Sequence, residues 1–222
     1  MWETLPWTSK HRNLPGRGAL PHSGIDWRLK KLWQSMILII GLAILPSCLS
    51  SSEKTMKTLP KKTETTILAG GCFWGMQDIL RKIPGILYTE VGYTGGQTKN
   101  PRYEDVKTGK TGHAEAVRVE FDPEKIGFEK VLSYFFRMHD PTTVNRQGND
   151  IGTQYRSAIF TLSETQKQIA EQKKQEIEKS KKWPRPVATE IIEASTFYPA
   201  EEYHQDYLEK NPGGYTCHFL RD

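Results

Sequence analysis

The segment Gly70-Gly71-Cys72-Phe73-Trp74-Gly75 could carry thiol chemistry. A strand-forming run precedes it, and Phe73–Arg81 has helical composition, which predicts Cys72 at the start of a helix. Unpaired backbone N–H groups and the helix dipole at that position favour a thiolate over a thiol. The two leading glycines would let a ligand approach the backbone closely, and the two aromatic residues would form an apolar wall beside the sulfur. The alternative is a buried structural cysteine in a strand-to-helix turn.

The elements that would position this cysteine follow from residue pattern. Runs rich in Val, Ile, Thr and Tyr predict strands at Thr65–Ala69, Ile86–Tyr93, His113–Phe121, Tyr155–Leu162 and Thr189–Ala194. Further helices are predicted at Gly127–Met138 and at Glu164–Ser180, whose thin Ile169/Ile177 stripe is typical of a surface helix. We therefore predict an α+β fold, a ferredoxin-like α/β sandwich with helices packed on one mainly antiparallel sheet. The segments 95–111, 139–153 and 197–222 lack a pattern and are predicted to be functional loops.

Eight motifs in order resemble those of the peptide methionine sulfoxide reductase A family, and the resemblance covers essentially all of residues 65–218. They are GGCFWG (70–75), EVGYTGG (90–96), NPRYEDV (100–106), GHAEAV (112–117), HDPTT (139–143), NRQGNDIGTQYRSAIF (145–160), FYPAEEYHQDY (197–207) and NPGGYTC (211–217). A single GCFW motif would not be specific, whereas this many matches in order are.

The resemblance implies an enzyme that reduces methionine S-sulfoxide, free or in peptides, and thereby repairs oxidised proteins. Cys72 is similar in position to the family's nucleophile, which attacks the sulfoxide sulfur and becomes a sulfenic acid. Glu115 resembles the proton donor, which burial should keep protonated near neutral pH. Cys217 resembles the cysteine that resolves the sulfenic acid as a disulfide. The substrate-binding residues implied in the same way are Tyr103 and Tyr155 for the sulfoxide oxygen, Asp150 completing the polar pocket, and Phe73 and Trp74 for the methyl group.

Without the resemblance, each of these residues has a plainer interpretation. Glu115 could be a surface glutamate of an alternating strand, Tyr155 a core strand tyrosine, Asp150 a turn residue and Cys217 an inert tail cysteine. A Cys72 disulfide requires the tail to bring the two Cα atoms within roughly 4.4–6.8 Å. The paired glycines at 213–214 would permit that rearrangement.

No bound cofactor and no metal site are expected. His113 and His204 are interpreted as hydrogen-bonded structural residues, and His218 follows Cys217 without a partner at metal-ligand spacing. By resemblance, electrons would come from thioredoxin or, outside the cytoplasm, from an envelope thioredoxin-like dithiol protein. Two rival functions stay open: a Cys–His–Asp hydrolase with His113 or His204 as base, and an envelope lipoprotein that uses the domain only for binding.

The charge distribution argues against nucleic-acid binding. The chain of 222 residues carries a net charge of +5, but residues 1–62 hold ten Lys and Arg against three Asp and Glu, whereas residues 63–222 hold 21 against 23. The basic excess therefore lies outside the predicted catalytic domain at 63–222. That domain is expected to be a monomer.

The N-terminal region has the parts of an export signal. We interpret residues 1–35 as a disordered or mis-annotated extension, with translation starting near Leu29, residues 36–48 as a signal and residues 49–62 as a flexible tether. The apolar run at 36–45 is shorter than the roughly 18 residues of a spanning helix, and Cys48 follows it as in a loose bacterial lipobox. An uncleaved membrane anchor is the alternative. Both predict an exported domain tethered to the membrane and facing the periplasm or cell envelope.

Overall fold

The computed structural model describes residues 62–222. The predictions for the export signal, for Cys48 and for residues 49–61 lie outside these described residues. The described elements are β1 (Glu64–Gly70), α1 (Phe73–Leu80), β2 (Ile86–Thr94), α2 (Tyr103–Val106), β3 (Ala114–Phe121), α3 (Phe128–Met138), β4 (Arg146–Gln147), β5 (Asp150–Ile151), η2 (Thr153–Tyr155), β6 (Ser157–Thr161), α4 (Glu164–Lys179), β7 (Glu190–Glu193), β8 (Tyr198–Pro199), η3 (Glu202–His204) and α5 (Tyr207–Lys210).

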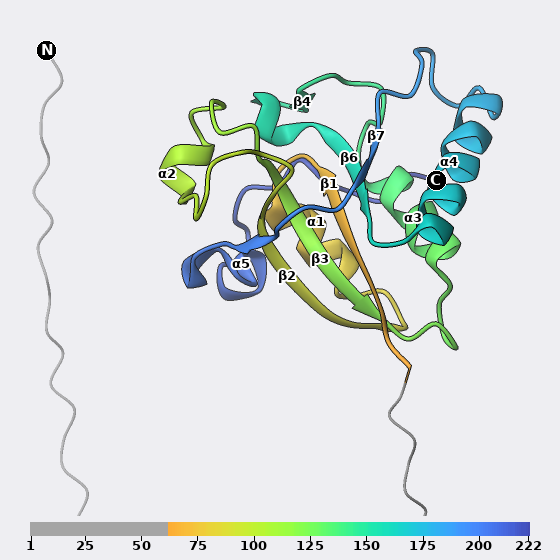
Figure 1. Cartoon of the computed structure of the whole chain (residues 1–222), viewed down its shortest axis with the longest axis horizontal. Coiled ribbons are helices and arrows are strands. Elements are labelled where there is room, and N and C mark those ends of the chain that lie inside the picture. Colours follow the sequence, from red (N-terminus) through yellow and green to blue (C-terminus); the bar gives the residue numbers. More distant parts are fainter. Residues whose placement is uncertain (1–61) are drawn as a thin grey trace, which may run out of the picture. The chain divides into compact units, whose positions relative to one another are not determined.

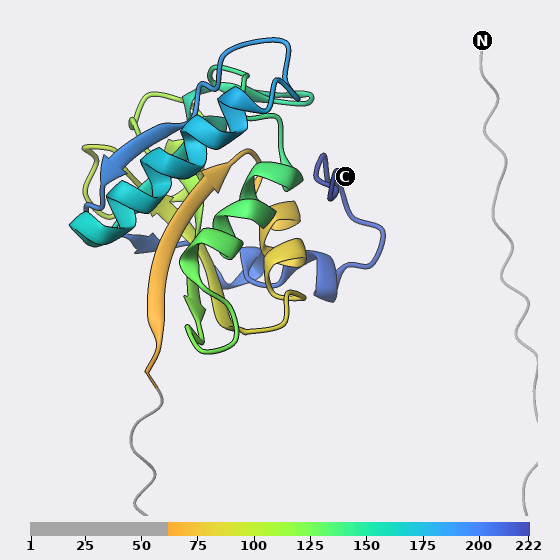
Figure 2. The same ribbon diagram turned by 90° about the vertical axis from the view of Figure 1, so that its right-hand side faces the viewer.

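Six strands form one sheet in the order β7-β6-β1-β3-β2-β8, and β4 and β5 pair separately (Figure 1). All paired strands are antiparallel except β6 and β7. The four strands β1, β2, β3 and β6, together with α1 and α3, have the βαββαβ order of a ferredoxin-like sandwich, which confirms the predicted class. Helices α1, α3 and α4 lie together on one face of the sheet (Figure 2). Among the described residues, no helix has both the length and the apolar character needed to cross a bilayer.

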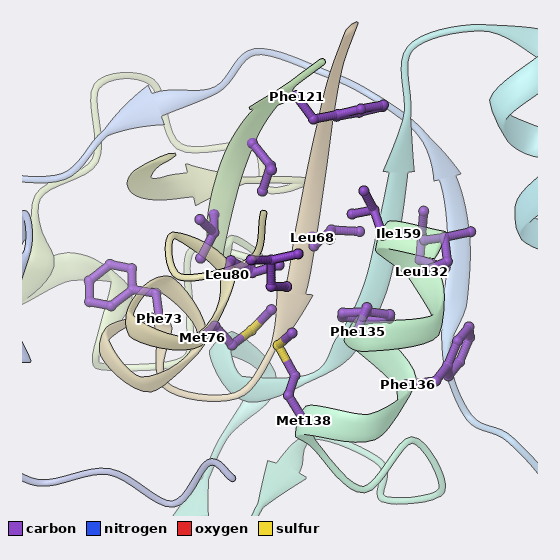
Figure 3. Packing of buried hydrophobic residues seen from close by; sticks show 14 of the residues in the cluster. Leu68, Phe73, Met76, Leu80, Phe121, Leu132, Phe135, Phe136, Met138 and Ile159 are labelled. Carbon is purple, nitrogen blue, oxygen red and sulfur yellow. The ribbon is translucent and has the colours of Figure 1, made fainter. Parts of the chain in front are cut away.

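The main core lies between the sheet and the helices (Figure 3). Alternating strand positions such as Leu68 and Val117 face the helices, where Met76, Leu80 and Phe135 pack against them without exposure to solvent. Burial of each such side chain contributes roughly 1.5–3 kcal/mol, so α1 is fixed firmly on the sheet. This rigid contact sets the position of the residue at the N-terminus of α1.

The predicted strands and helices are all present, with ends within two residues of the prediction. Tyr155 differs from the prediction in its type of structure: it ends the short helix η2 and does not begin a strand. The segments without a sequence pattern contain short elements of two to four residues, including α2, β5 and α5. A periodic pattern needs about two turns of helix or several strand residues to be visible, so elements of this length leave none.

Candidate active site

Cys72 is the N-cap residue of α1, and its side chain is only 7% exposed. Strand β1 runs through the middle of the sheet and ends at Gly70, after which Gly71 turns the chain with a φ of 109°. Residues with a Cβ rarely adopt that conformation, so the turn requires glycine. The strand, glycine turn and helix predicted from the sequence are present, with the sulfur at the helix N-terminus.

The space beside Gly70 and Gly71 is filled by the protein's own side chains. A Cβ on Gly70 would lie 3.1 Å from the ring of His139, and one on Gly71 would lie 2.7 Å from the side chain of Gln147. The expectation that these glycines admit a ligand to the backbone is therefore wrong for this structure. They allow the buried loop that carries Cys72 to pack tightly.

Glu115 reaches the start of α1 from strand β3. Its side chain shares the helix-facing side of β3 with Val117, is 2% exposed and accepts a hydrogen bond of 3.2 Å from the backbone N–H of Phe73. Burial raises its pKa to about 8, the Phe73 N–H acts in the opposite direction, and the charge of Asp150 raises it further. At neutral pH the carboxyl holds its proton, in agreement with the sequence-based expectation.

The Cys72 thiol does not have the low pKa expected from its helix position. Burial is the largest cause of a pKa far above the ordinary value, Glu115 raises it further once that carboxyl ionises, and the backbone N–H of Trp74 opposes the rise. Removal of the thiolate from water outweighs the helix N-terminus here. The predicted resting thiolate is therefore corrected to a resting thiol beside a protonated Glu115.

Aromatic side chains surround the start of α1. The indole Nε1 of Trp74 donates a 3.0 Å hydrogen bond to His204 Nδ1, and the ring stacks on Tyr207 with centroids 3.8 Å apart. Phe73 is 1% exposed, and its ring centroid lies 5.2 Å from that of His204. The ring centroid of Tyr103 lies 4.5 Å from that of the same imidazole. The predicted apolar wall is thus a wider cluster that also includes η3 and α5.

Tyr103 is held in place by Glu201. The Glu201 carboxylate accepts hydrogen bonds of 2.9 Å from the backbone N–H of Tyr103 and from the hydroxyl of Tyr93. Burial acts to raise the Glu201 pKa, but these hydrogen bonds lower it below its ordinary value. Glu201 is therefore a charged anchor that fixes the start of α2 against β2.

Tyr155 and Asp150 come from the neighbouring loop. The pKa of the Tyr155 hydroxyl is raised chiefly by burial, and negative charge on any of four nearby groups would raise it further: Glu115, Tyr103, Asp150 and Cys72. The same charges act on it because these groups lie around one centre. The site residues predicted from the sequence, apart from Cys48, are therefore brought together around the start of α1.

Cys217 lies in the C-terminal tail, which has no regular structure. Its Sγ donates to Asp150 Oδ2 at 3.4 Å and lies 3.5 Å from His218 Nδ1, and Asp150 also accepts from the hydroxyl of Tyr215. Burial raises the Cys217 pKa to about 11, and the Asp150 charge contributes. Both Cys72 and Cys217 are free thiols in this structure, so their disulfide stays a prediction.

The histidines named for the hydrolase alternative are engaged elsewhere. His113 Nδ1 accepts from the backbone N–H of Gly96, and its Nε2 lies 2.8 Å from the carbonyl oxygen of Thr98. His204 Nδ1 accepts from Trp74. Neither ring is hydrogen-bonded to Cys72, so the Cys–His pair of such a hydrolase is not assembled. Within residues 62–222 no three His, Cys, Asp or Glu side chains are grouped as metal ligands would be.

The sequence predicts no role for Tyr93, Glu201, Tyr207 or His218. Glu201 and Tyr207 lie in the motif at 197–207, which resembles the family as a whole but gives neither residue a role. Their contacts join segments about 100 residues apart or more, and no local pattern records such a pairing.

The chain was compared with known proteins. A family model described as "Peptide methionine sulfoxide reductase" matches residues 64–221. The peptide methionine sulfoxide reductase MsrA of Pseudomonas fluorescens is 53% identical over 163 residues, which are 73% of this chain and 76% of the relative. The reduced form of Mxr1 from Saccharomyces cerevisiae superposes with a TM-score of 0.70 at 41% identity, over 76% of this chain and 98% of that one. Mxr1 in complex with Trx2 gives a TM-score of 0.51 at 29% identity, over 76% and 97% of the two chains.

Proposed function

The chain belongs to the peptide methionine sulfoxide reductase A family, and from this premise we propose which residues perform the reaction and where it takes place. The established part is the activity: the enzyme reduces methionine sulfoxide with thiols and so repairs oxidised proteins. The observation that carries the residue assignment is the buried pair of Cys72 and protonated Glu115 at the start of α1.

In the first half-reaction, Cys72 Sγ attacks the sulfoxide sulfur while the Glu115 carboxyl gives its proton to the sulfoxide oxygen. The carboxylate that forms then accepts the thiol proton, which removes the need for a resting thiolate. The oxygen is transferred to Cys72, giving a sulfenic acid, and methionine leaves. The substrate sulfur gains two electrons and Cys72 loses two, so no other reductant enters this step.

Substrate recognition divides between polar and apolar groups. The hydroxyls of Tyr103 and Tyr155 hold the sulfoxide oxygen, and their raised pKa values keep them as donors. Phe73 and Trp74 receive the methyl group, and the 3.0 Å bond to His204 fixes the plane of the indole. The preference for the S epimer is carried over from the family resemblance.

The second half-reaction resolves the sulfenic acid. Cys217 attacks Cys72, a disulfide forms and water leaves. A thioredoxin-like dithiol protein then reduces the disulfide, as the complex of Mxr1 with Trx2 suggests by analogy. The enzyme itself needs no bound cofactor for either half-reaction and acts as a monomer.

A single-turnover experiment tests this scheme. Cys217→Ser should release one methionine per enzyme and leave Cys72 one oxygen atom heavier and reactive towards dimedone. Repeated thioredoxin-driven turnover by this variant would remove the resolving role of Cys217. Sulfoxide binding without methionine release would favour the binding-module alternative, and ester or amide hydrolysis without a reductant would favour the hydrolase.

Export rests on the sequence of residues 28–48, with its basic residues, apolar run and Cys48. The proposed mature enzyme is a lipoprotein that begins at Cys48 and works at the cell envelope, where a membrane-fed thioredoxin-like protein would reduce it. An intact mass of the membrane-extracted protein should correspond to a lipidated chain from Cys48. A mass that retains residues 36–47 would instead support the uncleaved anchor, and one that includes residues 1–26 would refute the internal start.

A further inference from the structure

His218 places one nitrogen against the backbone beside the nucleophile and the other against the resolving thiol. The ring is 7% exposed; its Nε2 lies 2.9 Å from the carbonyl oxygen of Gly70, and its Nδ1 lies 3.5 Å from Cys217 Sγ. A carbonyl oxygen only accepts hydrogen bonds, so Nε2 must carry a proton. In the neutral ring, Nδ1 then keeps its lone pair and faces the thiol.

We propose that His218 is the general base that removes the proton of Cys217 when this thiol attacks the Cys72 sulfenic acid. The inference rests on the proposed function, because it concerns the second half-reaction of that scheme. As the proton moves to His218 Nδ1, the Cys217 sulfur forms the S–S bond to Cys72 and the S–O bond of the sulfenic acid breaks. The hydroxide leaves as water with a proton from the Glu115 carboxyl. Cys217 is oxidised and the sulfenic sulfur is reduced, and the imidazolium then returns its proton to Glu115 through solvent.

The resolving thiol needs such a base. With its pKa raised to about 11, only on the order of one Cys217 in ten thousand would be a thiolate at pH 7. Burial lowers the His218 pKa, so the ring is neutral and able to accept a proton at that pH. Transfer produces a thiolate and an imidazolium in contact, and their attraction favours the transfer.

Charged and titratable groups face His218 from several elements. Asp150 of β5 favours the imidazolium, Arg221 of the tail opposes it, and His139 at the end of α3 interacts with the ring. Asp150 is also the rival base, because its Oδ2 lies 3.4 Å from Cys217 Sγ. A carboxylate is by class the weaker base towards a thiol, and this one already accepts the Tyr215 hydroxyl.

The local fold is shaped to hold the ring. A Cβ on Gly75 of α1 would clash with the Thr216 hydroxyl and would lie 2.7 Å from His218 Nδ1, so glycine there makes room for the tail that carries the imidazole. The backbone N–H of His218 donates 3.1 Å to Thr216 Oγ1, which turns the tail towards α1. The bond to Gly70 therefore anchors the tail beside Cys72, and an experiment must separate this anchoring from base catalysis.

His218→Gln makes that separation. The amide Nε2 of Gln can still donate to the Gly70 carbonyl, but the amide is not a base. Rapid mixing with one equivalent of methionine sulfoxide should give wild-type methionine release and disulfide formation slowed roughly 10²–10⁴-fold at pH 7. The slowed step should quicken about tenfold per pH unit up to about pH 8, above which Glu115 loses the proton that the leaving hydroxide needs. The wild-type step should be nearly flat between pH 6.5 and 8, because His218 is already neutral there.

The outcomes are distinct. If methionine is not released at all, the proposed function fails, whatever His218 does. If methionine is released and His218→Gln forms the disulfide at the wild-type rate, the inference fails. If Asp150→Asn slows the disulfide step to the same extent and His218→Gln does not, Asp150 is the base. Should His218→Gln not fold, the wild-type profile decides alone, because a disulfide rate that still rises about tenfold per pH unit between pH 6.5 and 8 excludes an imidazole base.

Discussion

Replacing Glu115 by Gln should slow sulfoxide reduction and at the same time stabilise the fold. The carboxyl is held in a buried site that favours its neutral form, with a pKa of about 8 against an ordinary value of 4.5. The folded state therefore binds this proton more tightly than the unfolded state. The stability that the proton contributes is complete below pH 4.5 and is lost as the pH rises to about 8.

The magnitude follows from the shift. Wild type should lose about 1.4 kcal/mol of unfolding free energy per pH unit relative to Glu115→Gln, or about 3 kcal/mol between pH 4.5 and 7. The amide has nearly the same shape and can still accept from the backbone N–H of Phe73. Denaturant unfolding of both proteins between pH 5.5 and 7 would measure the slope, because Glu115 is then ionised only in the unfolded state and the other titrating groups cancel in the difference.

The catalytic half of this prediction concerns the proton itself. Without a general acid, methionine release in a single turnover should fall roughly 10²–10⁴-fold at pH 7, and the wild-type rate should decline above pH 8 while the variant's does not. Glu120→Gln on the opposite side of β3 is the matched control and should keep the wild-type rate. A Glu115→Gln variant with an unchanged rate, or with the wild-type pH slope of stability, would refute the reasoning.

Three further results are expected. Tyr155→Phe should lower the single-turnover rate roughly 10²-fold with little change in fold, because a donor to the sulfoxide oxygen is lost; stopped-flow methionine release measures it. Trp74→Leu removes the stacked indole, so the factor by which KM for methionine sulfoxide rises should exceed the factor by which kcat falls by about 3–10-fold. An equal effect on both constants would place Trp74 in the chemical step. His139 has its pKa lowered to about 3 by burial, so its contribution to stability is present above pH 6.5 and lost as the pH falls. Below pH 6.5 the unfolding free energy of His139→Gln should therefore exceed that of wild type by about 1.4 kcal/mol more for each pH unit. Acid unfolding measures this, and parallel curves of unfolding free energy against pH would contradict it.

The elements that support the site could be predicted from the sequence because their patterns are local. The alternation in β3 places Glu115 and Val117 on one side, and the glycine turn before α1 places Cys72 at a helix start. The family motifs supplied the roles of Tyr103 and Tyr155. These residues act through contacts with loops, and the residue pattern around each of them predicted only a strand or nothing.

The parts that could not be predicted depend on contacts between distant segments. Glu201 reaches Tyr93 and Tyr103 from about 100 residues away, and His218 reaches Gly70 across 148 residues. Each contact is a single hydrogen bond made by a residue of a loop or of the tail. No periodic pattern encodes it, and only the packed fold decides whether it forms.

The corrected ionisation of Cys72 changes how the site must work. A helix N-terminus lowers a thiol pKa only while the sulfur stays partly hydrated, and at 7% exposure the lost hydration is the larger effect. A neutral thiol beside a neutral carboxyl is stable in this dry pocket, whereas a thiolate there would lose its hydration and would be repelled by Glu115 whenever that carboxyl ionised. Reaction must therefore begin when the sulfoxide oxygen takes the carboxyl proton, which creates the base that the thiol requires. It follows that the free enzyme should alkylate slowly at Cys72 at pH 7, although the same sulfur attacks bound sulfoxide readily.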